Sequence, residues 1–161
     1  GATVIGTVGS AEKAELARAC GYHHVINYRE ESVVERVREL TGGAGLPVVY
    51  DGVGRDTFFD SLDCLRPRGL MVSFGNASGS PPPLDLQELA QRGSLFITRP
   101  TLLSYVADDA ELQASAAAVL DRVADGRLTV TVEQRYDLAD VRRAHEDLEG
   151  RRTTGSSLLL P

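Results

Sequence analysis

The chain has 161 residues, 42% of them hydrophobic and 25% charged, which is typical of one globular domain with a sizeable core. The formal net charge is -6, with acidic residues scattered along the chain, and this argues against nucleic acid as a partner. No apolar run approaches the roughly 20 residues of a membrane-spanning helix, and the first residues lack the charged region of a signal peptide. We therefore expect no membrane association and a cytoplasmic location.

Short apolar runs alternate with helix-like segments from the first residues onward. This pattern predicts an α/β fold, with helices on both faces of a parallel, doubly wound sheet. Four runs are nearly continuous in apolar content, as strands buried on both faces are. They cover residues 3–8, 24–27, 48–51 and 70–74, and each is predicted to be a central strand.

Helices are predicted between these strands. The first covers residues 12–20, with Ser10 placed to cap its N–H groups and Gly21 suited to its left-handed exit. Apolar residues at helical spacing mark the next two helices and should cover the sheet. They are Val33, Val34, Val37 and Leu40 in one helix, and Phe58, Phe59, Leu62 and Leu65 in the other.

The second half of the chain is less regular. Two glycines and three prolines in residues 75–83 predict a loop. A short helix over residues 84–91 and a strand from Ser94 to Thr98 follow. A long helix with an apolar face and an extended segment over residues 128–136 come next. A helix that packs through His145 and a strand over residues 157–160 complete the pattern.

The end of the first strand combines groups that suit a phosphate. Gly9 and Ser10 offer backbone N–H groups and a hydroxyl, and Lys13 adds a cation on the following helix. NAD-preferring folds carry an acid at this strand end, which would repel a 2'-phosphate, and that acid is missing here. The residues therefore favour NADPH, in a cationic pocket without carboxylates. Tyr28 could bring its phenol to the same place; alternatively, Lys13 is a solvated helix charge and Tyr28 covers the core.

Two further strand ends carry small or amide-bearing residues where a nicotinamide ring could lie. Glycines let the backbone approach a flat ring closely, and such cofactors bind at the carboxyl edge of a parallel sheet. An ordinary tight turn is the alternative for the first of these ends. The candidate residues are Val53 and Gly54 at the first end, and Phe74, Gly75 and Asn76 at the second.

No metal site is expected. Cys20, His23 and His24 lie close together in the sequence, but no second pair of ligands follows at a zinc-binding spacing. Cys20 is placed instead on an apolar helix face with Leu16. Cys20 and Cys64 are both expected to be free thiols. No residue stands out as a nucleophile or a general acid, so no catalytic residue is assigned.

Four segments and the C-terminal stretch around Gly155 carry a resemblance to a known family. The segments are Gly-Thr-Val-Gly-Ser-Ala-Glu-Lys at residues 6–13, Val-Ile-Asn-Tyr-Arg-Glu-Glu at 25–31, Val-Tyr-Asp-Gly-Val-Gly at 49–54 and Gly-Leu-Met-Val-Ser-Phe-Gly-Asn at 69–76. In this order they resemble the zinc-free NADPH:quinone oxidoreductases, relatives of zeta-crystallin in the medium-chain dehydrogenase/reductase superfamily. The resemblance covers essentially the whole chain.

The resemblance implies NADPH as the cofactor, with Ser10, Lys13, Tyr28 and Arg151 around its 2'-phosphate and residues 74–76 near its nicotinamide. Taken alone, Arg151 is equally well a surface charge. The implied fold is a Rossmann-like doubly wound α/β sheet that lacks its first strand and glycine-rich turn. Residues 1–125 would be this partial dinucleotide-binding domain, and residues 126–161 a C-terminal return segment that packs on a catalytic domain absent from the chain.

The resemblance also implies an enzyme. The complete protein would transfer a hydride from NADPH to a quinone or an activated alkene, whereas this chain alone is expected to be inactive. A homodimer joined through the edge strand near Ser94 and Thr98 is implied as well. The alternative is a non-catalytic nucleotide-binding or dimerisation module. A methyltransferase of similar architecture would need an acid where Ser10 stands.

The strand that the resemblance marks as missing would lie at the centre of the sheet. Its absence should leave two strand edges without a partner. We expect either a longer chain cut before Gly1 or a second copy that fills the gap.

Overall fold

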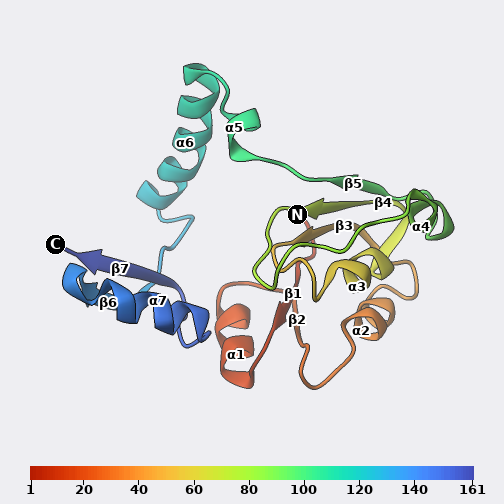
Figure 1. Ribbon diagram of the computed structural model, residues 1–161, viewed down its shortest axis with the longest axis horizontal. Coiled ribbons are helices and arrows are strands. Elements are labelled where there is room, and N and C mark those ends of the chain that lie inside the picture. The colour runs from red at the N-terminus through yellow and green to blue at the C-terminus, as the bar shows by residue number, and fades with distance from the viewer. The chain divides into compact units, whose positions relative to one another are not determined.

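The computed structural model describes all 161 residues and divides the chain into two compact units, Gly1–Leu102 and Leu103–Pro161. In the first unit, strands and helices alternate along the chain (Figure 1). The domain boundary expected after residue 125 stays a prediction. The elements up to the division are β1 (Ile5–Val8), α1 (Ala11–Ala19), β2 (His24–Asn27), α2 (Val33–Leu40), β3 (Leu46–Asp51), α3 (Phe58–Asp63), β4 (Leu65–Ser73), α4 (Leu86–Gln91) and β5 (Phe96–Thr98), with α5 (Leu102–Tyr105) at the division itself.

The strands of the first unit form two parallel sheets, with the orders β1-β2 and β3-β4-β5. β1 therefore pairs only with β2, and β3 pairs only with β4. These pairings confirm the predicted α/β fold with parallel strands and the two strand edges without a partner. In the register of the two sheets, Val8 is opposite Asn27 and Asp51 is opposite Ser73. Gly9 and Tyr28, which follow the first of these pairs, are therefore neighbours, and so are Gly52 and Phe74, which follow the second.

Polar side chains fix where three helices of the first unit begin. Ser10, Ser32 and Asp85 each accept a hydrogen bond from a backbone N–H in the first turn of α1, α2 and α4. Such caps satisfy N–H groups that have no partner within the helix. Gly21 follows α1 with a φ of 89°, the left-handed conformation that a glycine adopts readily at a helix exit.

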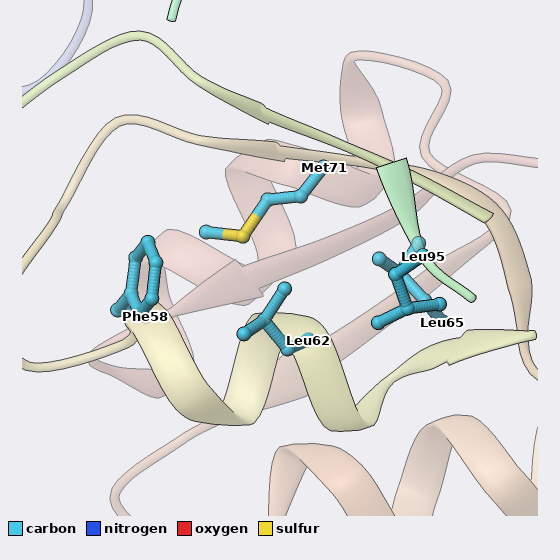
Figure 2. Close-up of a cluster of buried hydrophobic side chains, with 5 residues drawn as sticks. All are labelled: Phe58, Leu62, Leu65, Met71 and Leu95. Carbon is cyan, nitrogen blue, oxygen red and sulfur yellow. The ribbon is translucent and has the colours of Figure 1, made fainter. Parts of the chain in front are cut away.

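A first cluster of buried side chains joins α3 to β4. It contains Phe58, Leu62, Leu65, Met71 and Leu95. Leu62 and Met71 are fully buried, and Figure 2 shows the side chains of α3 pointing toward Met71 on β4. The apolar spacing that predicts this helix face is therefore confirmed for Phe58 and Leu62.

A second cluster joins the two sheets of the first unit. It contains Ile26 of β2, Val37 of α2 and Cys64, the residue after α3. Ile5 of β1 and Val49 of β3 pack against it. The first unit therefore holds together across the two unpaired strand edges through its side chains, without a hydrogen-bonded strand between them.

The prediction of a strand buried on both faces is wrong for β3. In β3, Val49 packs against the core, whereas Tyr50 is 74% exposed and Val48 is exposed as well. Successive side chains of a strand point to opposite faces of the sheet. Residues of α2 and α3 form buried clusters with Val49, on one face of β3. These helices do not cover the other face, which carries Val48 and Tyr50.

The second unit contains α6 (Asp109–Ala124), β6 (Val132–Asp137), the 3-10 helix η1 (Leu138–Asp140), α7 (Val141–Glu149) and β7 (Ser156–Leu160). β6 and β7 pair in parallel. The extended segment begins at Val132 rather than at residue 128. Leu120 of α6 and Leu148 and His145 of α7 are exposed, so the packing predicted for His145 is wrong. No helix of either unit combines the length and the apolar character needed to cross a bilayer.

Candidate functional site

The first group of candidate residues lies where β1 ends and α1 begins. Ser10 is the N-cap of α1, and its hydroxyl oxygen accepts a hydrogen bond from the backbone N–H of Lys13 at 3.3 Å. Lys13 therefore stands in the first turn of the helix, and it is partly buried. Because a helix N-terminus carries partial positive charge, both the backbone and the lysine favour an anion at this corner.

Tyr28 lies beside the same corner. Its backbone N–H donates to the carbonyl oxygen of Val8 at 3.1 Å, one residue beyond the end of the β1-β2 pairing. Its phenol contacts Gly9, since a Cβ built on Gly9 would lie 2.4 Å from the hydroxyl oxygen. The structure thus brings Gly9, Ser10, Lys13 and Tyr28 into one corner. Their role as cofactor ligands stays a prediction.

An acidic side chain also lies at this corner, so the expectation of a pocket without carboxylates is wrong. Hydrogen bonds with its own backbone N–H and with the Ser10 hydroxyl lower the pKa of Glu12, in the first turn of α1. A carboxylate is favourable at a helix N-terminus. The acid of NAD-preferring folds stands at a strand end, whereas Glu12 stands inside the helix. Glu12 is exposed, so its side chain is not enclosed by the protein.

A buried carboxylate organises the turn between β3 and α3. One oxygen of Asp51 accepts from the N–H groups of Val53 at 2.8 Å and Gly54 at 2.9 Å. The other oxygen accepts from the hydroxyls of Thr57 at 2.8 Å and Ser61 at 2.7 Å. Asp51 is not among the site residues predicted from the sequence. Such a turn has a signal in the sequence. An acidic residue ends a strand, glycines follow it, and the next helix carries Ser or Thr hydroxyls.

The surroundings of Asp51 keep its carboxyl group ionised. Burial raises the pKa of a carboxyl group, but hydrogen bonds from Gly54, Ser61, Thr57 and Val53 outweigh burial here and lower the pKa of Asp51 below its usual value. The N–H groups of Val53 and Gly54 are thereby used within the protein. These two residues can therefore offer a ligand a surface for close packing rather than their backbone donors.

The end of β4 lies against this turn. The N–H groups of Phe74 and Gly75 donate to the carbonyl oxygen of Asp51 at 2.9 and 3.3 Å. A Cβ on Gly75 would lie 2.3 Å from the carbonyl oxygen of Gly52, and one on Gly52 would lie 2.9 Å from the Phe74 ring. Side chains at either position would therefore push the two strand ends apart. The glycines allow the two strand ends to pack closely against each other.

An apolar pocket of about 360 Å³ opens beside Asn76. The β3–α3 turn is next to it, because a Cβ on Gly54 would lie 3.2 Å from the Cα of Asn76. An amide and a guanidinium are the strongest polar groups of the lining, an arrangement that can orient a small apolar ligand bearing an oxygen atom. The lining residues are Phe58, Ser73, Asn76, Pro81, Leu84, Ile97, Thr98 and Arg99.

Arg151 lies in the second unit, in the turn after α7. Its φ of 57° is left-handed, and its N–H donates to the carbonyl oxygen of Leu148 at 3.0 Å. The neighbouring Arg152 folds back onto the helix, and its Nε donates to the carboxylate of Asp147 at 2.8 Å. Because Arg151 belongs to the other unit, its part in the candidate site stays a prediction.

The cysteine and histidines near the end of α1 do not form a metal site. Cys20 and Leu16 are both exposed, so the expectation that they share a packed apolar face is wrong, and Ala14 is the buried residue of this helix. The Nδ1 atom of His23 accepts from the N–H of Val4 at 3.1 Å. No group of three or more His, Cys, Asp or Glu side chains in the structure could hold a metal ion.

The family described as zinc-binding dehydrogenase matches residues 1–120 of the chain. The chain belongs to this family. Zinc-binding dehydrogenases are named for a metal, but the side chains of this chain do not fit a zinc site. We therefore assign no metal chemistry to them.

Individual relatives are similar to this protein over the whole chain. A quinone oxidoreductase of Salmonella typhimurium is 56% identical and a 2-haloacrylate reductase of Burkholderia sp is 48% identical, each covering 100% of the chain. The structure of an Escherichia coli quinone oxidoreductase complexed with NADPH is 53% identical over 100% of the chain, with a TM-score of 0.97. The chain spans about half the length of these relatives, 50%, 49% and 50% respectively.

Proposed function

We propose that the first unit binds NADPH and is the nucleotide-binding half of a quinone oxidoreductase. The observation that carries this proposal is the corner where Gly9, Ser10, Lys13 and Tyr28 meet at the ends of β1 and β2. A lysine, a helix N-terminus and two hydroxyl groups suit the charge and the oxygen atoms of a 2'-phosphate. The similarity to a quinone oxidoreductase complexed with NADPH supports the proposal.

The nicotinamide ring is assigned to the surface at the ends of β3 and β4. Phe74 is exposed there, Gly52 and Gly75 bring the two strand ends into close contact, and Asn76 offers an amide beside the apolar pocket. When bound, NADPH supplies a hydride from C4 of its nicotinamide ring. The residues of this surface orient the ring, and the apolar pocket excludes water from it. No side chain of this chain is assigned a proton transfer.

The acceptor is assigned to the class of quinones and activated alkenes. Similarity to quinone oxidoreductases and to a 2-haloacrylate reductase supports both acceptors. An apolar pocket with one amide and one guanidinium suits a flat ring or a short alkene that carries carbonyl or carboxylate oxygens. Arg151 of the second unit is assigned to the 2'-phosphate by resemblance.

The partner assigned to the protein is a second copy of itself, joined through β5. This strand pairs only with β4, and its other edge has no partner in the chain. Phe96 of β5 is 61% exposed, and Ile97 is exposed as well. An unpaired edge strand with apolar side chains is suited to extending a sheet across two subunits.

We assign the protein to the cytoplasm. Residues 126–161 are assigned to a segment that packs on a further domain.

Replacing Lys13 tests the cofactor assignment. In the full-length gene product that contains these residues, Lys13→Gln should weaken NADPH binding about 10-fold, because the variant loses a hydrogen bond to the charged 2'-phosphate. NADH has no 2'-phosphate, so its binding should be unchanged. Arg18→Gln is the matched control, since Arg18 lies on the same helix in an exposed pair with Glu15. Equal affinities for the two cofactors, unaffected by Lys13→Gln, would refute the assignment.

A second measurement separates an enzyme from a binding module. The full-length gene product should oxidise NADPH when a quinone is supplied, followed by the loss of NADPH absorbance. Binding of NADPH without turnover of quinones or activated alkenes would favour the non-catalytic module.

A further inference from the structure

A guanidinium group spans the end of β4 from the neighbouring strand. Arg99 directly follows β5, and its Nη1 donates to the carbonyl oxygen of Ser73 at 2.9 Å and to that of Gly75 at 3.2 Å. Both carbonyls belong to the segment that leads from β4 to Asn76. One side chain therefore contacts the backbone before and after Phe74.

These carbonyls lie where the β4–β5 ladder has ended. The last paired residues are Val72 and Thr98, and β5 gives way to Arg99 and then Pro100, which has no N–H to donate. Buried or half-buried carbonyl groups need a donor. The Arg99 guanidinium supplies it in place of a further strand residue.

The same segment is held from its other side by β3. The N–H groups of Phe74 and Gly75 donate to the carbonyl oxygen of Asp51, and Asp51 itself is fixed by four hydrogen bonds. Residues 73–75 therefore lie between a fixed β3 turn and the guanidinium from β5. Removing Arg99 would leave the segment attached on one side only.

We propose that Arg99 is a positioning residue that holds the backbone of Ser73, Phe74 and Gly75 in the conformation required by the nicotinamide end of the bound cofactor. This inference rests on the proposed function. Both hydrogen bonds come from one guanidinium nitrogen, whose two N–H groups are held in a plane at the end of the long Arg99 side chain. The ammonium of a lysine would stand on a shorter, flexible stem and lack this fixed orientation. Arg99 acts on the cofactor through these backbone atoms. A positive charge at this position without the two hydrogen bonds should therefore not position the segment.

Arg92 offers a matched control at the opposite end of β4. Its Nε donates to the carboxylate of Asp63 at 2.7 Å, it pairs with Glu88, and it lies 5.7 Å from the centre of the Phe59 ring. Asp63 ends α3 just before β4 begins. Arg92 thus stabilises the fold through the same chemical group, away from the end of β4 that carries Asn76.

The test compares two ligands that share one half. NADPH contains the nicotinamide ring, whereas adenosine 2',5'-bisphosphate contains only the phosphate end that the Lys13 corner would bind. In the full-length gene product, Arg99→Met should weaken NADPH binding about 5-fold, the effect of roughly one hydrogen bond, and leave bisphosphate binding unchanged. Arg99→Lys should behave like Arg99→Met. Arg92→Met should lower the melting temperature without changing the ratio of the two affinities.

The outcomes separate this inference from the proposed function. An unchanged ratio of the two affinities in Arg99→Met, with the wild type binding both ligands, would overturn the inference alone. A wild-type protein that binds neither ligand would overturn the proposed function and this inference with it. If Arg99→Met does not fold, Arg99→Lys provides the same comparison.

Discussion

The hydroxyl group of Tyr28 lies against the backbone of Gly9 so closely that a Cβ at residue 9 would be only 2.4 Å from its oxygen atom. Gly9 directly follows β1 and Tyr28 directly follows β2, so this contact joins the ends of the two strands. A glycine is needed at this position because a side chain would not fit. Its backbone conformation does not require a glycine, since its φ is not left-handed. The contact fixes where the phenol lies relative to Ser10 and Lys13.

Gly9→Ala should move the phenol out of this corner. The nearest atoms belong to the outer end of a half-exposed side chain, which can shift, so the free energy of unfolding should change by less than about 1 kcal/mol. NADPH affinity, measured by calorimetric titration of the full-length gene product, should fall about 5-fold because a donor to the phosphate is displaced.

In a Tyr28→Ala background, Gly9→Ala should no longer affect binding, since the two residues act through one contact. An equal loss of affinity in both backgrounds would show that Gly9 acts independently of Tyr28.

Glu12 should oppose the binding of a 2'-phosphate. Its carboxylate shares the Ser10 hydroxyl, and hydrogen bonds with its own backbone and with Ser10 hold its pKa below the usual value, so it is charged at neutral pH. Glu12→Gln should strengthen NADPH binding about 3-fold at low salt, a small effect because the group is exposed. Glu15→Gln, on the same helix, should leave the affinity unchanged. Weaker NADPH binding in Glu12→Gln would show that Glu12 supports the site instead.

Replacing Asp51 should destabilise the first unit in a pH-dependent manner. Asp51→Asn removes the charge that four donors surround, so the free energy of unfolding at pH 7 should fall by about 1–3 kcal/mol. Because the folded-state pKa of Asp51 is lowered, this stabilisation is present above the unfolded-state pKa of about 4 and is lost as the pH falls through the folded value. The difference between wild type and variant should therefore shrink below about pH 4.

Urea unfolding at several pH values measures this effect. Asp56→Asn is the control, because Asp56 is exposed and pairs only with the exposed Arg55 among the side chains. A difference between wild type and Asp51→Asn that stays constant down to pH 3 would contradict the linkage.

Local patterns in the sequence predict most of the first unit, because each depends on residues near one another in the chain. The strand at residues 24–27 is found as predicted, and the cap by Ser10 is confirmed by its hydrogen bond to the Lys13 N–H. The spacing of Phe58 and Leu62 likewise predicts their burial. Helix periodicity and capping are local properties, which is why they can be inferred without the fold.

What the sequence does not predict depends on contacts between distant segments. Tyr50 has the apolar neighbours of a central strand, yet it is exposed because the helices of the buried clusters pack on the Val49 side alone. Arg99 has no motif around it, and its contacts with Ser73 and Gly75 arise only when β5 lies beside β4. Glu12 enters the candidate site through helix geometry rather than through the strand-end position at which an acid is expected.

The two cysteines should differ sharply in reactivity. Burial, together with the nearby carboxylates of Asp60 and Asp63, raises the pKa of Cys64 to about 11, whereas Cys20 is exposed at the end of α1. The thiolate is the reactive form, and a thiol with that pKa is roughly 0.1% ionised at pH 8. Iodoacetamide at pH 8 should therefore modify Cys20 within minutes and leave Cys64 untouched in the native protein, as read by mass spectrometry. Cys20→Ser should remain unmodified until urea exposes Cys64, and native labelling of Cys64 at the rate of Cys20 would mean that the second buried cluster opens readily.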